Sequence, residues 1–164
     1  MQRNAKRRRE PARAGAGDSS VYAEAAAVCA CTSFRKASRA VTQLFDEALQ
    51  PSGLRSTQLI LLLEIAIAEP ATVPRLARKL VMDPSTVTRN LQPLVKRGLL
   101  ASLAGDRNQT FRLTARGRET LERAVPLWER TQTAFVERLG AERWQAMLRD
   151  LSEAVSIARG RADA

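Results

Sequence analysis

The chain has 164 residues, enough for one domain with a buried core, and a formal net charge of +10. It contains no histidine, which removes the most common general base and the usual protein ligand of zinc, and it has no glycine-rich phosphate loop or nucleophile elbow. The sequence therefore predicts a protein that is not an enzyme and needs no metal or cofactor, and its positive charge favours a polyanionic partner.

Residues 1–19 form a basic tail with six lysine or arginine residues against two acidic ones. The tail has no apolar run, so it is predicted to be disordered and is not a secretory signal. An arm that grips DNA and a simple solvated tail are both compatible with this composition. The most apolar segment, 59–68, contains Glu64 and is far shorter than the ~20 residues that span a bilayer. We therefore expect a cytoplasmic protein with no membrane partner.

Residues 20–164 are expected to form one mainly α domain, whose first helix is predicted over about 21–50 from the helical spacing of its apolar residues. Cys29 and Cys31 fall on this helix. Residues two apart on a helix point about 200° away from each other, so a disulfide between them is geometrically poor. Cys31 falls near the apolar stripe and Cys29 on the other side. Small buried residues and redox-sensitive thiols in a basic setting are both open interpretations.

The next helix is predicted over 57–68, with Ser56 as its N-cap. It is apolar nearly all round, which places it in the core.

Two short helices joined by a tight turn are predicted within 72–100. The first runs from about Pro74 to Val81. The second opens with Asp83, whose side chain can accept a hydrogen bond from a free N–H of the first turn, followed by Pro84, which is preset for a helical start. The apolar residues of the second helix fall on one side, and the opposite side is polar, with two cations and no carboxylate.

Such a polar face is suited to a DNA major groove, because hydroxyls and amides reach base edges and guanidinium groups match guanine or phosphate. An ordinary helical hairpin with a solvated face would show the same pattern. Pro93 removes an N–H from the helix interior, so a bend is expected there. The predicted DNA-binding residues are Ser85, Thr86, Thr88, Arg89, Gln92, Lys96, Arg97, Arg78 and Arg107.

After Gly98, two segments of strand length, 99–103 and 109–114, flank a turn that contains Gly105. Two strands with a basic tip make a wing that can meet phosphate or a minor groove. A plain surface hairpin with one incidental arginine is the alternative. The predicted wing-tip residues are Asp106, Arg107 and Asn108.

Two further helices are predicted over about 115–138 and 142–158, separated by Gly140. Their apolar faces have too little of the chain left to cover them, which indicates a partner set of helices. A monomeric helical bundle is the alternative.

The segments LARKLVMDPSTVTRNLQPLVKRGLL (76–100), GDRNQTFRLT (105–114) and ARG (115–117) together resemble the MarR family of winged-helix transcriptional regulators. The likeness continues upstream over 33–63 and covers roughly 28–157. The wing departs from the family in two ways. Asn108 occupies a position that is usually basic, and the spacing from Asp106 to the Leu113–Thr114 pair is one residue short.

The resemblance implies a winged helix-turn-helix, with the DNA-binding unit at about 56–114, flanked by dimerisation helices at about 21–50 and 115–159. It implies a homodimeric repressor that binds double-stranded DNA at a near-palindromic operator and is released by a small-molecule effector or by oxidation of Cys29 or Cys31. The alternative function is nonspecific nucleic-acid coating or an architectural role. The serine, threonine, arginine and glutamine face argues against it, since a coating protein needs only positive charge there.

Overall fold

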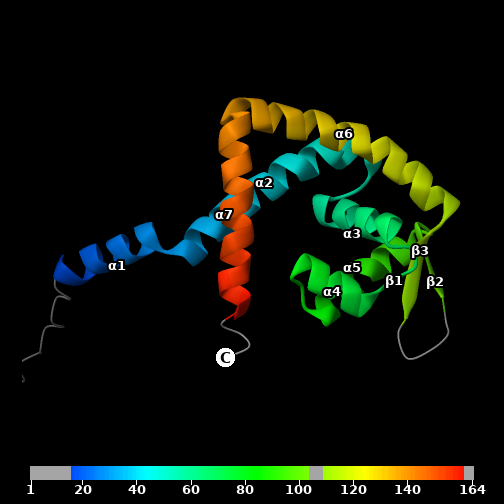
Figure 1. Ribbon diagram of the computed structural model, residues 1–164, viewed down its shortest axis with the longest axis horizontal. Helices are drawn as coiled ribbons and strands as arrows, with labels where there is room; N and C mark the ends of the chain where they lie inside the picture. Colours follow the sequence, from blue (N-terminus) through cyan, green and yellow to red (C-terminus); the bar gives the residue numbers. More distant parts are fainter. Residues whose placement is uncertain (1–15, 104–108, 161–164) are drawn as a thin grey trace, which may run out of the picture. The chain divides into compact units, whose positions relative to one another are not determined.

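The structure, a computed structural model, describes residues 16–103 and 109–160. The chain divides into two compact units, Met1–Val41 and Thr42–Ala164. The first contains helix α1 (Ala16–Val28) and the start of helix α2 (Ala30–Leu49), and the remaining elements belong to the second (Figure 1). The fold is mainly α with one small sheet, as the sequence predicted.

The single helix predicted over 21–50 is two helices, because the helical pattern is interrupted at Cys29. The Cys29 carbonyl accepts a hydrogen bond from the Ser33 N–H at 3.0 Å, so Cys29 stands at the start of α2 as an N-cap residue does. The α1 helix begins at Ala16 and so includes the last four residues of the segment that the sequence assigned to the tail. The alanine-rich stretch that follows has the high helix propensity needed to support this longer helix. Residues 1–15 lie outside the described part of the chain.

In the second unit, a 3-10 turn (Gln50–Ser52) connects α2 to helix α3 (Ser56–Ile67). The prediction that Ser56 caps α3 is wrong, because the N-cap position belongs to Arg55, whose N–H donates to Gln58 Oε1 at 3.1 Å. Ser56 is the first helical residue. Its N–H and its hydroxyl both donate to Asp46 Oδ1 at 2.7 Å, so a carboxylate on α2 satisfies the first turn of α3.

The predicted helix-turn-helix is present as helices α4 (Val73–Leu80) and α5 (Pro84–Lys96). Thr72 caps α4 by accepting a hydrogen bond from the Arg75 N–H at 3.4 Å. Val81 ends α4 in the left-handed region with φ of +53°, and the Met82 N–H returns to the Ala77 carbonyl at 2.9 Å. These contacts form the tight turn that sends α5 across α4.

The sheet has three antiparallel strands in the order β1-β3-β2, formed by β1 (Ala71–Thr72), β2 (Leu100–Leu103) and β3 (Thr110–Leu113). The hairpin pairs Leu100 with Leu113 and Leu103 with Thr110. The sequence predicted β2 and β3 but not β1, because a strand of two residues has no periodicity to detect.

One hydrophobic core joins α3, α4, α5 and the sheet. Leu62 and Ile65 of α3 are fully buried, as expected for its nearly all-apolar surface, and Phe111 and Leu113 supply the inner face of β3. The core therefore fixes α5 and the hairpin to the same body, so that neither can move far without the other.

Helix α6 (Ala115–Leu139) starts beside the sheet, and helix α7 (Ala141–Gly160) leaves its far end in a different direction after Gly140 (Figure 1). Thr114 caps α6 by accepting from the Gly117 N–H at 3.0 Å. The rings of Phe135 and Trp144 meet edge to face with centroids 5.8 Å apart, joining α6 to α7. Among the described residues, none of the α7 side chains is buried. No helix in the described ranges is long and apolar enough to cross a bilayer.

Candidate nucleic-acid interface

Helix α5 presents a polar face to solvent while its apolar face is anchored in the core. Val87, Leu91 and Leu94 are all at most 1% exposed, which confirms the predicted inner face. The side chains on the opposite side are exposed: Ser85, Arg89, Gln92 and Lys96. The face predicted to read DNA is therefore accessible along its whole length.

The first turn of α5 is held by Asp83, as predicted. Its Oδ1 accepts a hydrogen bond from the Ser85 N–H at 2.8 Å. Hydrogen bonds from the Ser85 side chain and backbone hold the pKa of the Asp83 carboxyl below its ordinary value of 3.8, with a smaller contribution from the positive charge of Arg89. The carboxylate is thus ionised at neutral pH and complements the positive end of the helix dipole.

Thr86 and Thr88, also predicted as DNA-binding residues, are half-buried beside this face. The Thr88 hydroxyl donates to the Pro84 carbonyl at 3.0 Å, which occupies its proton and leaves its oxygen as an acceptor. Pro93 lies inside α5, which continues to Lys96, and the bend predicted there stays a prediction.

Two of the predicted DNA-binding arginines are exposed and lie outside helix α5. Arg78 lies in the last turn of α4, and its carbonyl accepts from Arg159 Nη1 at 3.5 Å. Arg97 follows the last residue of α5, and its Nη2 lies over Gly53, 3.3 Å from where a β-carbon on that glycine would be. Both cations are therefore accessible, but neither belongs to helix α5.

The wing is present as the β2–β3 hairpin, with a cross-strand hydrogen bond of 2.8 Å from Gln109 Nε2 to Ser102 Oγ. The predicted tip residues Asp106, Arg107 and Asn108 lie outside the described residues. Arg112 of β3 is exposed on the hairpin and adds a cation that we did not select from the sequence. The alternation of Arg112 with buried Phe111 and Leu113 was the signal that could have identified it.

The two cysteines differ from the expectation in both placement and burial. Cys29 is half-buried at the break before α2, whereas Cys31 is exposed on the first turn, the reverse of the predicted pattern. Hydrogen bonds from the side chain and the backbone N–H of Thr32 hold the pKa of the Cys29 thiol below its ordinary value of 9.0. A thiol at a helix N-terminus is a typical setting for an activated thiolate.

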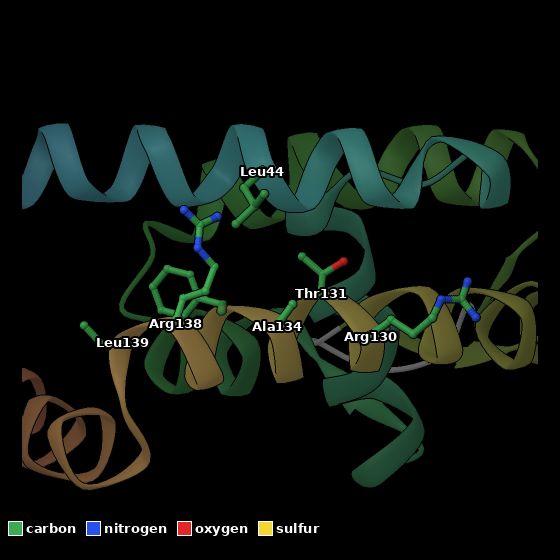
Figure 2. Close-up of a pocket in the computed structure, with 7 residues that line it drawn as sticks. Leu44, Arg130, Thr131, Ala134, Arg138 and Leu139 are labelled. Carbon is green, nitrogen blue, oxygen red and sulfur yellow. The ribbon is translucent and has the colours of Figure 1, made fainter.

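A cavity of about 680 Å³ lies between Leu44 of α2 and one face of α6. Figure 2 shows Leu44 and Thr131 projecting into the space between the two helices, and Arg138 reaching from α6 toward α2. Apolar walls with guanidinium groups beside them suit a ligand that is apolar and negatively charged. The residues that line the cavity are Leu44, Arg130, Thr131, Ala134, Phe135, Arg138 and Leu139.

Comparison with known proteins agrees with this geometry. The model of the MarR family matches residues 52–107. An uncharacterized HTH-type transcriptional regulator of Bacillus cereus is 31% identical over 109 residues, which cover 66% of this chain and 74% of that protein.

Solved structures extend the match to nearly the whole fold. The M. tuberculosis transcriptional regulator MosR is 36% identical, with a TM-score of 0.73 over 81% of this chain and 97% of its own. Its complex with DNA gives a TM-score of 0.74. The repressor CouR on a 23-mer DNA duplex is 25% identical, with a TM-score of 0.70 over 80% of this chain and 95% of its own. CouR bound to p-coumaroyl-CoA, at 23% identity and a TM-score of 0.73, shares the fold.

These relatives are transcriptional regulators and not enzymes. The chain belongs to the MarR family of winged-helix transcriptional regulators.

Proposed function

We propose that the protein binds a specific double-stranded DNA operator as a homodimer and represses transcription from it. The observation that carries this proposal is the exposed polar face of α5, fixed beside the hairpin by a common core. Ser85, Arg89 and Gln92 offer a hydroxyl, a guanidinium and an amide for base edges, and Lys96 offers a point charge for phosphate. The relatives MosR and CouR, whose structures include DNA, support this assignment.

The apolar surface of α7 supports the homodimer. Met147, Leu148, Leu151 and Val155 recur at helical spacing and are 36–43% exposed. Such a stripe on a helix favours association with other helices. Two copies related by a twofold axis would place their α5 helices in successive major grooves about 34 Å apart, so the operator should be a near-palindrome.

The test is selection of bound duplexes from a random pool, followed by measurement of affinity for the selected site and for random DNA at one salt concentration. A twofold-symmetric site, with a large ratio of specific to random affinity, supports the proposal. A site without symmetry, or a ratio close to one, favours the coating or architectural function. Leu151→Asp should produce monomers in sedimentation experiments and weaken binding, whereas Glu153→Ala on the same helix should change neither.

Release from DNA by a small molecule is supported by the cavity between Leu44 and α6, where Arg130 and Arg138 can pair with an anion. CouR, which shares this fold, has been solved bound to p-coumaroyl-CoA. Calorimetric titration with aromatic carboxylates and acyl-CoA thioesters tests this mode. Release by a small molecule is supported if a compound binds the wild type, lowers its operator affinity and fails to bind Arg138→Gln. Absence of binding by every compound of the panel excludes this mode.

Release by oxidation is supported by the lowered pKa of Cys29 and by the helix break at that residue. The geometric objection to pairing Cys29 with Cys31 applied to a continuous helix, which the chain does not have here. The Cys29 thiolate would attack hydrogen peroxide, forming a sulfenic acid and hydroxide. The Cys31 thiol would then displace water from that sulfenic acid and form a disulfide. Operator binding before and after mild peroxide should change in the wild type and stay constant in Cys29→Ser, and no change in the wild type would end this mode.

A further inference from the structure

Glu69 connects three elements that are far apart in the sequence. Its Oε1 accepts a hydrogen bond from the Leu113 N–H at 3.1 Å, at the end of β3. Its Oε2 lies 2.7 Å from Nη2 of Arg118, on the first turn of α6. One carboxylate therefore joins the segment before β1 to the base of the hairpin and to the start of the helix that follows it.

The side chain of Glu69 provides a hydrogen-bond acceptor for β3 beyond the point where its pairing with β1 stops. The β1–β3 pairing joins Ala71 to Phe111 and Thr72 to Thr110, and Leu113 lies two residues beyond the last paired residue of β3. Pro70, directly before β1, has no N–H to donate to the ladder. The Glu69 carboxylate accepts the hydrogen bond of the Leu113 N–H, which no residue of β1 reaches. It therefore extends the attachment of the hairpin beyond the last residue of β3 that pairs with β1.

The ion pair is too exposed to be a large source of stability. The side chain of Arg118 is 52% exposed and that of Glu69 is 24% exposed, and pairs with this exposure contribute little to the free energy of unfolding. The two contacts of Glu69 restrict the direction in which the hairpin extends, because they fix the end of β3 against α6. The hairpin extends from this point, so a small rotation at Leu113 produces a larger displacement further along it.

We propose that Glu69 is a positioning residue of the DNA interface, which holds the wing at the angle required for operator binding through Leu113 and Arg118. The inference rests on the proposed DNA-binding function. Glu69 carries a negative charge and would repel phosphate, so direct contact with DNA does not explain it. Its contribution to binding must come from the geometry that it imposes on the hairpin.

An electrostatic role and a positioning role of Glu69 predict opposite changes in operator affinity for Glu69→Gln, which makes the proposal testable. Removing a negative charge should strengthen binding to any duplex if only the electrostatic field matters. Loss of the ion pair should weaken binding to the operator if position matters. Arg118→Gln changes the charge in the other direction and breaks the same pair. A similar loss in both variants can therefore arise only from the interaction that they share.

The experiment measures operator and random-duplex affinity for wild type, Glu69→Gln, Arg118→Gln and Glu69→Asp, with Glu119→Gln and Arg116→Gln as charge-matched controls on exposed positions of α6. Glu69→Asp keeps the charge and shortens the side chain, so it separates reach from charge. We expect all three junction variants to lose operator affinity by about three- to tenfold, and the controls to change less. Circular dichroism melting should confirm that every variant is folded at the assay temperature.

A structural measurement accompanies the binding data. Exchange of the Leu113 amide hydrogen should be faster in Glu69→Asp, whose carboxylate is retracted from the strand, than in the wild type. Operator affinity at or above the wild-type value in Glu69→Gln, or a loss confined to one partner of the pair, overturns the proposal. Failure of the wild type to prefer its selected site over random DNA would instead overturn the proposed function itself.

Discussion

Gly117, in the first turn of α6, lies directly against the backbone carbonyl of Leu99, where the chain passes from α5 into β2. A β-carbon at position 117 would overlap that oxygen, and the Leu99 carbonyl already accepts hydrogen bonds from the N–H of Thr114 at 3.1 Å and its hydroxyl at 3.2 Å. The approach of α6 to the wing therefore requires glycine at this position.

Gly117→Ala should lower the free energy of unfolding by about 3 kcal/mol, because the clash is with backbone that cannot rotate away. Thermal and urea denaturation measure the change. Gly160→Ala is the matched control, since a β-carbon there meets nothing within 4 Å, and it should leave stability unchanged or slightly raised. Wild-type stability in Gly117→Ala would show that the helix and β2 are not in close contact in solution.

Val81 occupies the left-handed region in the turn between α4 and α5, at 55% exposure. A β-branched residue pays about 1–2 kcal/mol for this conformation, whereas glycine adopts it without strain. Val81→Gly should therefore raise the free energy of unfolding by about 0.5–1 kcal/mol after the greater flexibility of glycine in the unfolded chain is included. Val81→Ala keeps the positive φ and should give no comparable gain, and equal effects of the two substitutions would contradict the assignment of strain.

The Asp83 cap makes the stability of the winged unit dependent on pH. The folded pKa of Asp83 lies below its ordinary value of 3.8, so its contribution is complete above that value and is lost as the pH falls through the folded pKa. Asp83→Asn should retain the cap, since asparagine is also a good N-cap, but flatten this acidic part of the stability profile. Asp83→Ala should lower the melting temperature at neutral pH, and an unchanged melting temperature would show that the cap is dispensable.

The sequence predicted the parts of the fold that depend on local chemistry. Asp83 was identifiable as a cap because a side-chain acceptor directly before a helix has a fixed spacing to the N–H groups of the first turn, and the inner face of α5 follows from its helical period. Two of the failures arise from contacts with residues elsewhere in the sequence. Ser56 has a side chain typical of an N-cap, but its N–H donates to Asp46, ten residues earlier. Glu69 acts through Leu113 and Arg118, which lie 44 and 49 positions away. Neither contact leaves a local pattern.

Cys29 should be alkylated at lower pH than an ordinary thiol because Thr32 stabilises the thiolate. In a Cys31→Ser background, Thr32→Val should move the midpoint of iodoacetamide modification to higher pH, since the hydroxyl donor is removed and the backbone donor remains. Thr32→Ser restores a hydroxyl and should return the midpoint toward the wild-type value. Mass spectrometry of quenched samples measures the modified fraction, and equal midpoints in all variants would exclude this role for the Thr32 side chain.

Arg89 and Lys96 should differ in how they affect DNA binding. Arg89→Ala should cost about 1–3 kcal/mol at the operator and relax the preference for one base pair, because a guanidinium can read a base edge. Lys96→Ala should weaken binding to all sequences and reduce the salt dependence by about one counterion. Fluorescence anisotropy over a range of salt concentrations separates the two patterns. Arg149→Ala on α7 is the control for loss of one positive charge, and identical behaviour of all three would point to charge alone.

The cap at Asp83 has a thermodynamic consequence for encounter with DNA. The first turn of α5 is capped by Asp83 and its apolar face is already packed in the core, so this helix would need no ordering on entering a DNA groove as proposed. Binding by α5 should therefore carry little of the heat-capacity change that accompanies coupled folding, and the binding enthalpy should vary only weakly with temperature.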